Sequence, residues 1–191
     1  MSLTLRARRT RVLAGGTLVV ALGAAGVLGT VSANAESPQS RPAAASSAPA
    51  AEVSGRDTTT TTHLTTAAAT RAAQAALDAA QRAHQKVSVA VVDRDGRTVV
   101  TLRGDGAGPQ SYESAVKKAY TAVSWNAPTS DLVKRLDSAP TLKDIPGTLF
   151  LAGGAPVTAK GAPVAAVGVA GAPSGDQDET FAKAGVAALG R

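Results

Sequence analysis

The sequence contains no cysteine, so disulfide bonds, thiolate metal sites and cysteine nucleophiles are excluded. Aromatic residues make up only 3% of the chain, and there are two histidines. The core must therefore be built mainly from alanine, valine and leucine. With so few histidines a catalytic general base is hard to place. Neither a serine–histidine–aspartate triad nor a paired-carboxylate site is indicated.

Acidic residues are absent from the first 35 positions, which hold four arginines. The whole chain has a formal net charge of +6. From Glu36 onward, 16 lysines and arginines stand against 14 aspartates and glutamates, which leaves a net charge of +2. The basic character therefore belongs mainly to the first segment, and nucleic acid is not expected as a partner.

Residues 1–35 are typical of a secretory signal peptide. Arginines precede an apolar stretch, and Ala33-Asn34-Ala35 matches a cleavage site of the A-x-A type. Arg8-Arg9 also resembles a twin-arginine export signal, although Arg11 stands where an apolar residue is expected, so both export routes stay open. A retained anchor is the alternative, because the apolar stretch is long enough to span a bilayer. We expect a secreted protein, free or held at the cell wall.

Residues 36–62 are rich in serine, proline, alanine and threonine, a composition that cannot bury enough surface to order itself. They predict a disordered linker, and residues 63–191 are expected to form the folded domain. Helical spacing of apolar residues predicts a helix over 65–84, a second helix capped by Ser111, a short helix capped by Ser130 and a last helix capped by Ser174.

Strands are expected where β-branched residues concentrate, at 87–92, 98–102, 148–152, 155–159 and 164–170. Consecutive hairpins, the first through Asp95-Gly96, favour antiparallel pairing. The order of elements predicts an α+β fold with a five-stranded antiparallel sheet packed with helices. Two motif-like strings are set aside: Gly104–Gly108 is not a dinucleotide-binding motif, and Asp93–Gly96 lacks the remaining ligands of a calcium loop.

Several short motifs together resemble the GlcG/HbpS family over about residues 64–190. They are Val89-Ala90-Val91-Val92-Asp93, Lys118-Ala119-x-Thr121-Ala122, Ile145-Pro146-Gly147, Gly153-Gly154-x-Pro156-Val157 and Asp176-x-Asp178-Glu179. The resemblance implies a profilin-like fold, an octameric homo-oligomer, and binding of haem and iron outside the cell. It also implies a membrane-bound sensor kinase as partner, in a two-component system that senses haem or redox stress. Slow haem breakdown would then rest on the bound iron.

The resemblance implies that Thr148, which follows Ile-Pro-Gly, contacts the haem iron. A neutral hydroxyl is a weak ligand for this metal, which would suit exchangeable haem. Arg103, Lys143 and Lys160 are candidate partners for the haem propionates.

A surface iron site is also implied, with Glu113 and His63 at matching positions. The family's second acid is Val116 here, and its second histidine is Lys86, so this iron site is incomplete. The sequence does not decide whether the valine abolishes it.

Two other functions stay open. Related domains accompany glycolate-oxidation proteins or form part of corrinoid adenosyltransferases, so this chain could be an enzyme-associated accessory domain. Alternatively it could be an interaction module whose surface contacts a sensor without any ligand.

Overall fold

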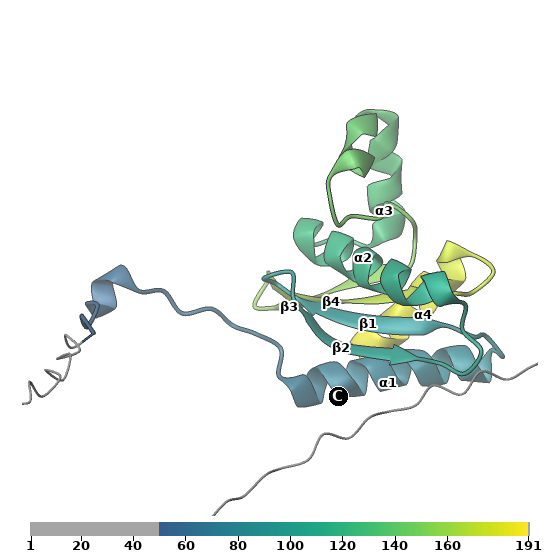
Figure 1. Ribbon diagram of the computed structural model, residues 1–191, viewed down its shortest axis with the longest axis horizontal. Coiled ribbons are helices and arrows are strands. Elements are labelled where there is room, and N and C mark those ends of the chain that lie inside the picture. The colour runs from purple at the N-terminus through teal and green to yellow at the C-terminus, as the bar shows by residue number, and fades with distance from the viewer. Residues whose placement is uncertain (1–49, 191) are drawn as a thin grey trace, which may run out of the picture. The chain divides into compact units, whose positions relative to one another are not determined.

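The structure is a computed structural model that describes residues 50–190 (Figure 1). The expected signal peptide and most of the expected linker lie outside the described residues. From Glu52 onward the chain forms one compact unit. Residues 50–63 of this part are exposed and irregular, apart from the short 3-10 turn Gly55–Asp57. Among the described residues, no helix is long and apolar enough to cross a membrane.

Four antiparallel strands form the sheet: β1 (Ser88–Asp93), β2 (Thr98–Arg103), β3 (Gly154–Ala159) and β4 (Ala162–Ala170). Their order is β2-β1-β4-β3, so the two most buried strands lie in the centre. Val91 of β1 lies opposite Val100 on one side and Val167 on the other. The β-branched content of these strands favours extended backbone, as expected from the sequence.

Helices cover both faces of the sheet. Helices α1 (Thr66–Arg82) and α4 (Gly175–Ala187) lie on one face, and α2 (Pro109–Trp125) lies on the other (Figure 1). Because side chains alternate along a strand, Val89 and Val91 of β1 enter the core beneath α1 and α4, while Val92 packs with α2. The expected α+β class with an antiparallel, helix-packed sheet is confirmed.

Helix α2 approaches the sheet closely because small residues face it. A side chain at Gly168 of β4 would collide with the backbone of Ala115 and Ala119 in α2. Glycine therefore fixes the distance between this helix and the sheet. The short helices α3 (Thr129–Val133), η2 (Lys134–Asp137) and η3 (Pro140–Asp144) follow α2 and rise beyond it in Figure 1.

The expectation of five strands is wrong, because residues 148–152 do not join the sheet. The backbone N–H of Leu149 donates to Thr121 Oγ1 of α2 at 2.8 Å, not to a neighbouring strand. Phe150 turns inward and meets Trp125 edge-on, with ring centroids 5.3 Å apart. The apolar run thus packs on α2 as an irregular segment, and regular pairing begins only at Gly154.

The expected cap of α2 is also corrected. The helix begins at Pro109, and its N-cap is Gly108, which offers no side-chain bond. Proline suits this first position because its missing N–H would have no helical partner there. Ser111 lies inside the first turn and is buried, and its hydroxyl is 2.8 Å from that of Ser88. It therefore joins α2 to β1 instead of capping the helix.

Candidate functional site

Thr148 lies in a short exposed turn directly after η3. Its side chain is partly buried, and its hydroxyl donates to the carbonyl of Ile145 at 2.7 Å. The ring of Tyr120, from α2, lies beneath the turn at Gly147. Since the hydroxyl hydrogen is used locally, the lone pairs of Thr148 Oγ1 stay free to accept a bond or to meet a metal ion.

Two exposed apolar residues stand three positions before and three positions after this threonine in the sequence. Ile145 is 41% exposed and Leu151 is 54% exposed. Across the described residues they are two of only four large hydrophobic side chains with such exposure, the others being Val53 and Tyr112. Exposed apolar residues on one short segment, with a polar residue between them in the sequence, offer surface to a flat, largely apolar ligand.

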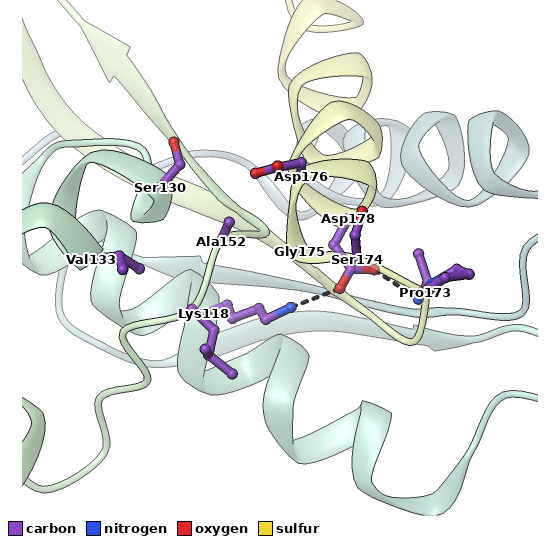
Figure 2. Close-up of a pocket in the computed structure, with 11 residues that line it drawn as sticks. Lys118, Ser130, Val133, Ala152, Pro173, Ser174, Gly175, Asp176 and Asp178 are labelled. Atoms are coloured by element: carbon purple, nitrogen blue, oxygen red, sulfur yellow. Dashed lines mark hydrogen bonds and ion pairs between the residues drawn. The ribbon is translucent and has the colours of Figure 1, made fainter.

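A pocket of about 450 Å³ opens next to this segment (Figure 2). Leu151 and Ala152 line one side, and the loop that leads into α4 lines another, with Pro173, Ser174 and Gly175. This volume lies within the range of small-molecule sites. Thr148 itself is not among the residues that line the pocket, so the predicted iron contact and the pocket are neighbours along the chain and do not form one cavity.

The floor of the pocket holds a buried ion pair. Lys118 Nζ lies 2.7 Å from Asp178 Oδ2 and donates to the carbonyl of Val169 at 3.1 Å. The side chains are only 6% and 4% exposed. Burial raises the pKa of Asp178, and the hydrogen bond and charge of Lys118 offset this only in part. The other carboxylate oxygen accepts the N–H of Ala172, which fixes the loop before α4.

Gly153 allows the backbone after Thr148 to lie close against this ion pair. Its φ of +132° lies in a region that residues with side chains rarely adopt. A side chain there would also meet Lys118 Nζ and the Val169 carbonyl, both under 3 Å away. The glycine therefore lets the segment after Thr148 close over the lysine.

A second buried carboxylate joins α4 to α3. Glu179 accepts the backbone N–H of Ser130 at 2.9 Å and its hydroxyl at 2.7 Å, and Lys183 lies 2.8 Å away. Burial acts to raise the pKa of Glu179, but the hydrogen bonds from Lys183 and Ser130 outweigh it and hold the pKa below its usual value. Glu179 thus holds the N-terminus of α3 next to the pocket.

The two residues expected at a surface iron site have different partners. Glu113 lies on the exposed face of α2 and pairs with Lys117 at 2.7 Å, which lowers the pKa of Glu113. His63 lies near the turn between β1 and β2, with Asp93 and Asp95. Within residues 50–190, the one group of three potential metal-ligating side chains contains His63 and not Glu113.

Of the residues considered for the propionates, Arg103 already binds a neighbouring carbonyl. Its guanidinium donates twice to Ala107, at 2.6 and 3.2 Å. Lys143, at the end of η3, and Lys160, in the β3–β4 turn, are exposed. Lys143 is five residues before Thr148, which makes it the better-placed cation along the chain.

The roles of Lys118 and Asp178 were missed from the sequence. Helical spacing assigns Lys118 to the polar face of α2 together with Lys117, and Asp178 to a simple helix start. One signal was available: Lys118 lies three residues after Ala115 and four before Ala122, both of which are buried. It therefore stands at the border of the apolar face, where a lysine needs a buried partner.

Comparison with known proteins agrees with the motifs. A family model described as "Haem degrading protein HbpS-like" matches residues 64–187. A double mutant of Streptomyces reticuli HbpS has 70% sequence identity over 76% of this chain and 99% of its own, with a TM-score of 0.73. Another HbpS crystal structure has 71% identity over 74% of this chain and 100% of its own, also with a TM-score of 0.73.

A more distant structure, a PduOC:heme complex, shares 27% identity over 66% of this chain and 95% of its own, with a TM-score of 0.61. Comparison with curated proteins returned no match. Since the family model spans well over half of the chain and the HbpS chains align almost completely, the chain belongs to the GlcG/HbpS family.

Proposed function

We propose that this chain is a haem-binding protein that holds haem against the segment 145–151. The exposure of Ile145 and Leu151, three positions before and three positions after Thr148 in the chain, is the observation that carries this proposal. They offer apolar contact to a porphyrin face, and the threonine offers an oxygen donor. The HbpS-like family and the heme complex of a relative support the same ligand.

Thr148 is the residue that would meet the haem iron, and Lys143 is the cation available along the chain for a propionate. A neutral oxygen donor on an exposed turn gives weak ligation, so haem would exchange readily. Bound haem supplies the oxidative chemistry of its own iron, and slow haem breakdown would rest on that. The protein would orient the haem without providing a general base.

The proposal also covers the location and the partners of the protein. The arginine-rich, apolar start and the Ala33-Asn34-Ala35 site support export from the cell. An exported haem-binding protein could report haem or redox stress to a membrane sensor kinase, which is tested by measuring its binding to the kinase ectodomain with and without haem. We also expect a homo-oligomer, as in the family, which light scattering tests. The profilin-like arrangement and the octamer stay expectations from the family.

A haemin titration followed by the Soret absorption band tests the central claim. We expect saturable binding to the unaltered protein and a weaker, shifted band for Thr148→Val, which removes the hydroxyl and keeps the shape. Thr148→Ser, which keeps the hydroxyl, should restore the original spectrum. Thr158→Val, at an exposed position of β3, is the matched control and should change nothing.

Two results would count against the proposal. If Thr148→Val gives the unaltered spectrum, Thr148 does not contact the iron, although haem could still bind. If the unaltered protein shows no Soret change with haemin, haem binding itself is wrong.

A further inference from the structure

Five consecutive threonines, Thr58–Thr62, stand directly before the folded domain and have no part in its core. All five are exposed, and they lie in no helix or strand, between the short turn Gly55–Asp57 and the start of α1 at Thr66. The cap of α1 is Thr65, and in the described chain Leu64 is the first residue that packs on the core. The run therefore presents hydroxyl groups to solvent and gives the fold no apolar contact.

Most of these hydroxyls are unused. Thr58 Oγ1 donates to the Gly55 carbonyl at 3.1 Å, and Thr61 Oγ1 lies 2.8 Å from His63 Nε2. Among residues 50–190 no side-chain hydrogen bond is made by the other three, Thr59, Thr60 and Thr62. Neither packing nor capping explains why the chain carries threonine at five positions in succession.

The exposed threonines that follow the run belong to helices or strands, or cap them. Thr70 in α1 and Thr180 in α4 each donate to a backbone carbonyl four residues earlier, at 2.9 Å. Thr158 is exposed but lies within β3. An enzyme that modifies a side chain also binds the backbone on either side of it, and an exposed irregular segment can enter its groove without local unfolding. Of these threonines, the run Thr58–Thr62 meets that condition.

The composition around the run indicates the kind of modification. Residues 36–62 are rich in serine, threonine, proline and alanine, which is typical of O-glycosylated segments. A flexible linker is served by glycine and serine, whereas threonine is branched at Cβ and stiffer. A linker role alone therefore does not account for five threonines, but a row of acceptor hydroxyls does.

We propose that Thr58–Thr62 are a site of O-glycosylation. This inference rests on the export in the proposed function and is independent of haem binding. The second substrate is an activated sugar, one whose anomeric carbon is esterified to a phosphate. Threonine Oγ1 forms a bond to that carbon as the bond from the carbon to the phosphate oxygen breaks. The hydroxyl proton passes to a base of the transferase, and no oxidant or reductant is needed.

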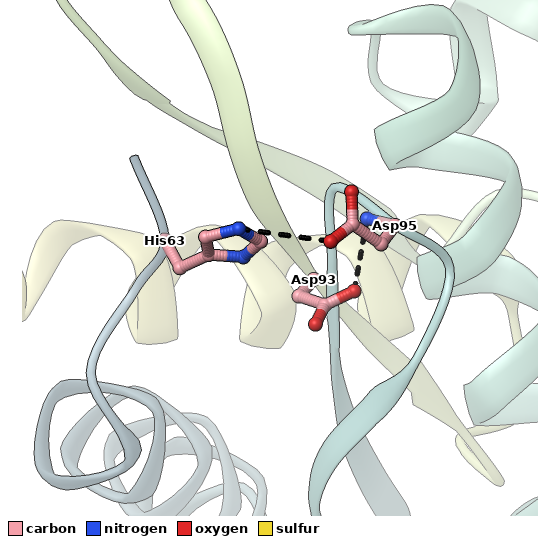
Figure 3. A group of neighbouring side chains, drawn as sticks. All are labelled: His63, Asp93 and Asp95. Carbon is pink, nitrogen blue, oxygen red and sulfur yellow. Dashed lines mark hydrogen bonds and ion pairs between the residues drawn. The ribbon is translucent and has the colours of Figure 1, made fainter. Parts of the chain in front are cut away.

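The position of the run suggests what the sugars do. Arg56 is exposed two residues before it, in a part of the chain that is open to proteases. At its other end the chain meets the domain, where His63 Nε2 lies 3.6 Å from Asp95 Oδ2 in the β1–β2 turn (Figure 3). Sugars on Thr58 and the next threonine would fill the space that a protease needs beyond a cut at Arg56. The modified chain should therefore resist cleavage there.

Mass spectrometry of the intact chain, recovered from the culture medium of its natural host, tests the site. We expect masses above that of the chain from Glu36 by whole sugar residues, and fragmentation that retains side-chain sugars should place them within 58–62. A variant with all five threonines replaced by alanine should have its bare mass. Thr70→Ala, on the exposed face of α1, is the matched control and should keep the sugars.

Limited trypsin digestion tests the effect of the sugars. The five-alanine variant should be cut after Arg56 at least several-fold faster than the unaltered exported chain. Both should have the same unfolding temperature, because buried side chains of the described chain begin only at Ala68.

The proposal is wrong if the chain in the medium has its bare mass, although export then stands. It is also wrong if the five-alanine variant keeps all of the sugars, because they would then lie on other residues. If the chain stays inside the cell, export is wrong and this proposal falls with it. Haem binding is measured separately at Thr148, so none of these results decides it.

Discussion

Lys118 and Asp178 form an ion pair that is almost wholly removed from water, with side chains 6% and 4% exposed. Such a pair gains little net stability, but losing one partner leaves a charge that neither water nor protein solvates. Lys118 also binds the Val169 carbonyl, and Asp178 binds the Ala172 N–H, so the pair joins α2, β4 and the start of α4. Its main role is to hold the pocket's floor in one arrangement.

We therefore predict that Lys118→Met destabilises the protein by about 3–5 kcal/mol, since the buried Asp178 carboxylate loses the cation with which it pairs. The double variant Lys118→Met, Asp178→Asn should recover most of this loss. The amide that Asp178→Asn introduces is neutral, and its oxygen can still accept the Ala172 N–H. Urea unfolding of the single and double variants measures both values. If the double variant is as unstable as the sum of the singles, the cost lies in packing and not in charge.

The sequence could not predict this pair, because its members are sixty positions apart. Helical periodicity assigns a lysine to the solvent-exposed face of a helix by default. An aspartate in the first turn of a helix is explained by the favourable helix N-terminus alone. The same limit applies to His63, whose partners Asp93 and Asp95 come from another segment. Thr148 was named from the family's motif, and neither its spacing nor its neighbours in the sequence indicate a ligand.

At the scale of the elements, the periodicity of apolar residues predicted the helices and strands whose formation depends on the local sequence pattern. The bounds of α1, β1, β2 and β4 differ by at most two residues from expectation, since alternation and helical spacing act within each element. The strand expected at 148–152 failed because a side chain 28 positions away, Thr121, takes the Leu149 N–H. Tertiary contacts of this kind override strand propensity, and a single sequence does not show them.

Glu179 joins two elements in a way that should depend on pH. Its pKa is lowered in the folded state, so the unfolded state binds a proton more readily. The stabilisation is present above the usual value of 4.5 and is lost as the pH falls through the folded value. We predict that Glu179→Gln costs about 2 kcal/mol at neutral pH, the value of hydrogen bonds to a charged group.

The difference in stability between Glu179→Gln and the unaltered protein should begin to shrink once the pH falls below 4.5, and should vanish below the lowered folded pKa, where Glu179 is protonated and uncharged. Chemical denaturation at a series of pH values measures this. Glu113→Gln is the control: its carboxylate is fully exposed and paired only with Lys117, so its removal should change stability little at any pH. A constant difference across the series would mean that Glu179 acts by shape and not by charge.

At the scale of the whole molecule, the compact unit begins at Glu52, and its core begins later still. Within the described residues, buried side chains begin at Ala68, and Leu64 is the first that packs on the core. The residues from 36 to 62 have a composition that cannot form a core of its own. Export and stability should therefore depend on different parts of the chain.

We predict that the protein is exported and that its mature chain begins at Glu36, as mass spectrometry of protein from the medium would show. We also predict that removing residues 36–51 leaves the unfolding temperature unchanged within about 1 °C. At the size of this domain about 1 kcal/mol shifts that temperature by several degrees, so a smaller change means that residues 36–51 make no stabilising contact with the domain.

A chain that starts at Leu64 should keep the fold, because Thr65 still caps α1 by accepting the Ala68 N–H. It should also keep haem binding, because the segment 145–151 is retained. If the chain from Leu64 unfolds at a markedly lower temperature, the segment before α1 stabilises the domain.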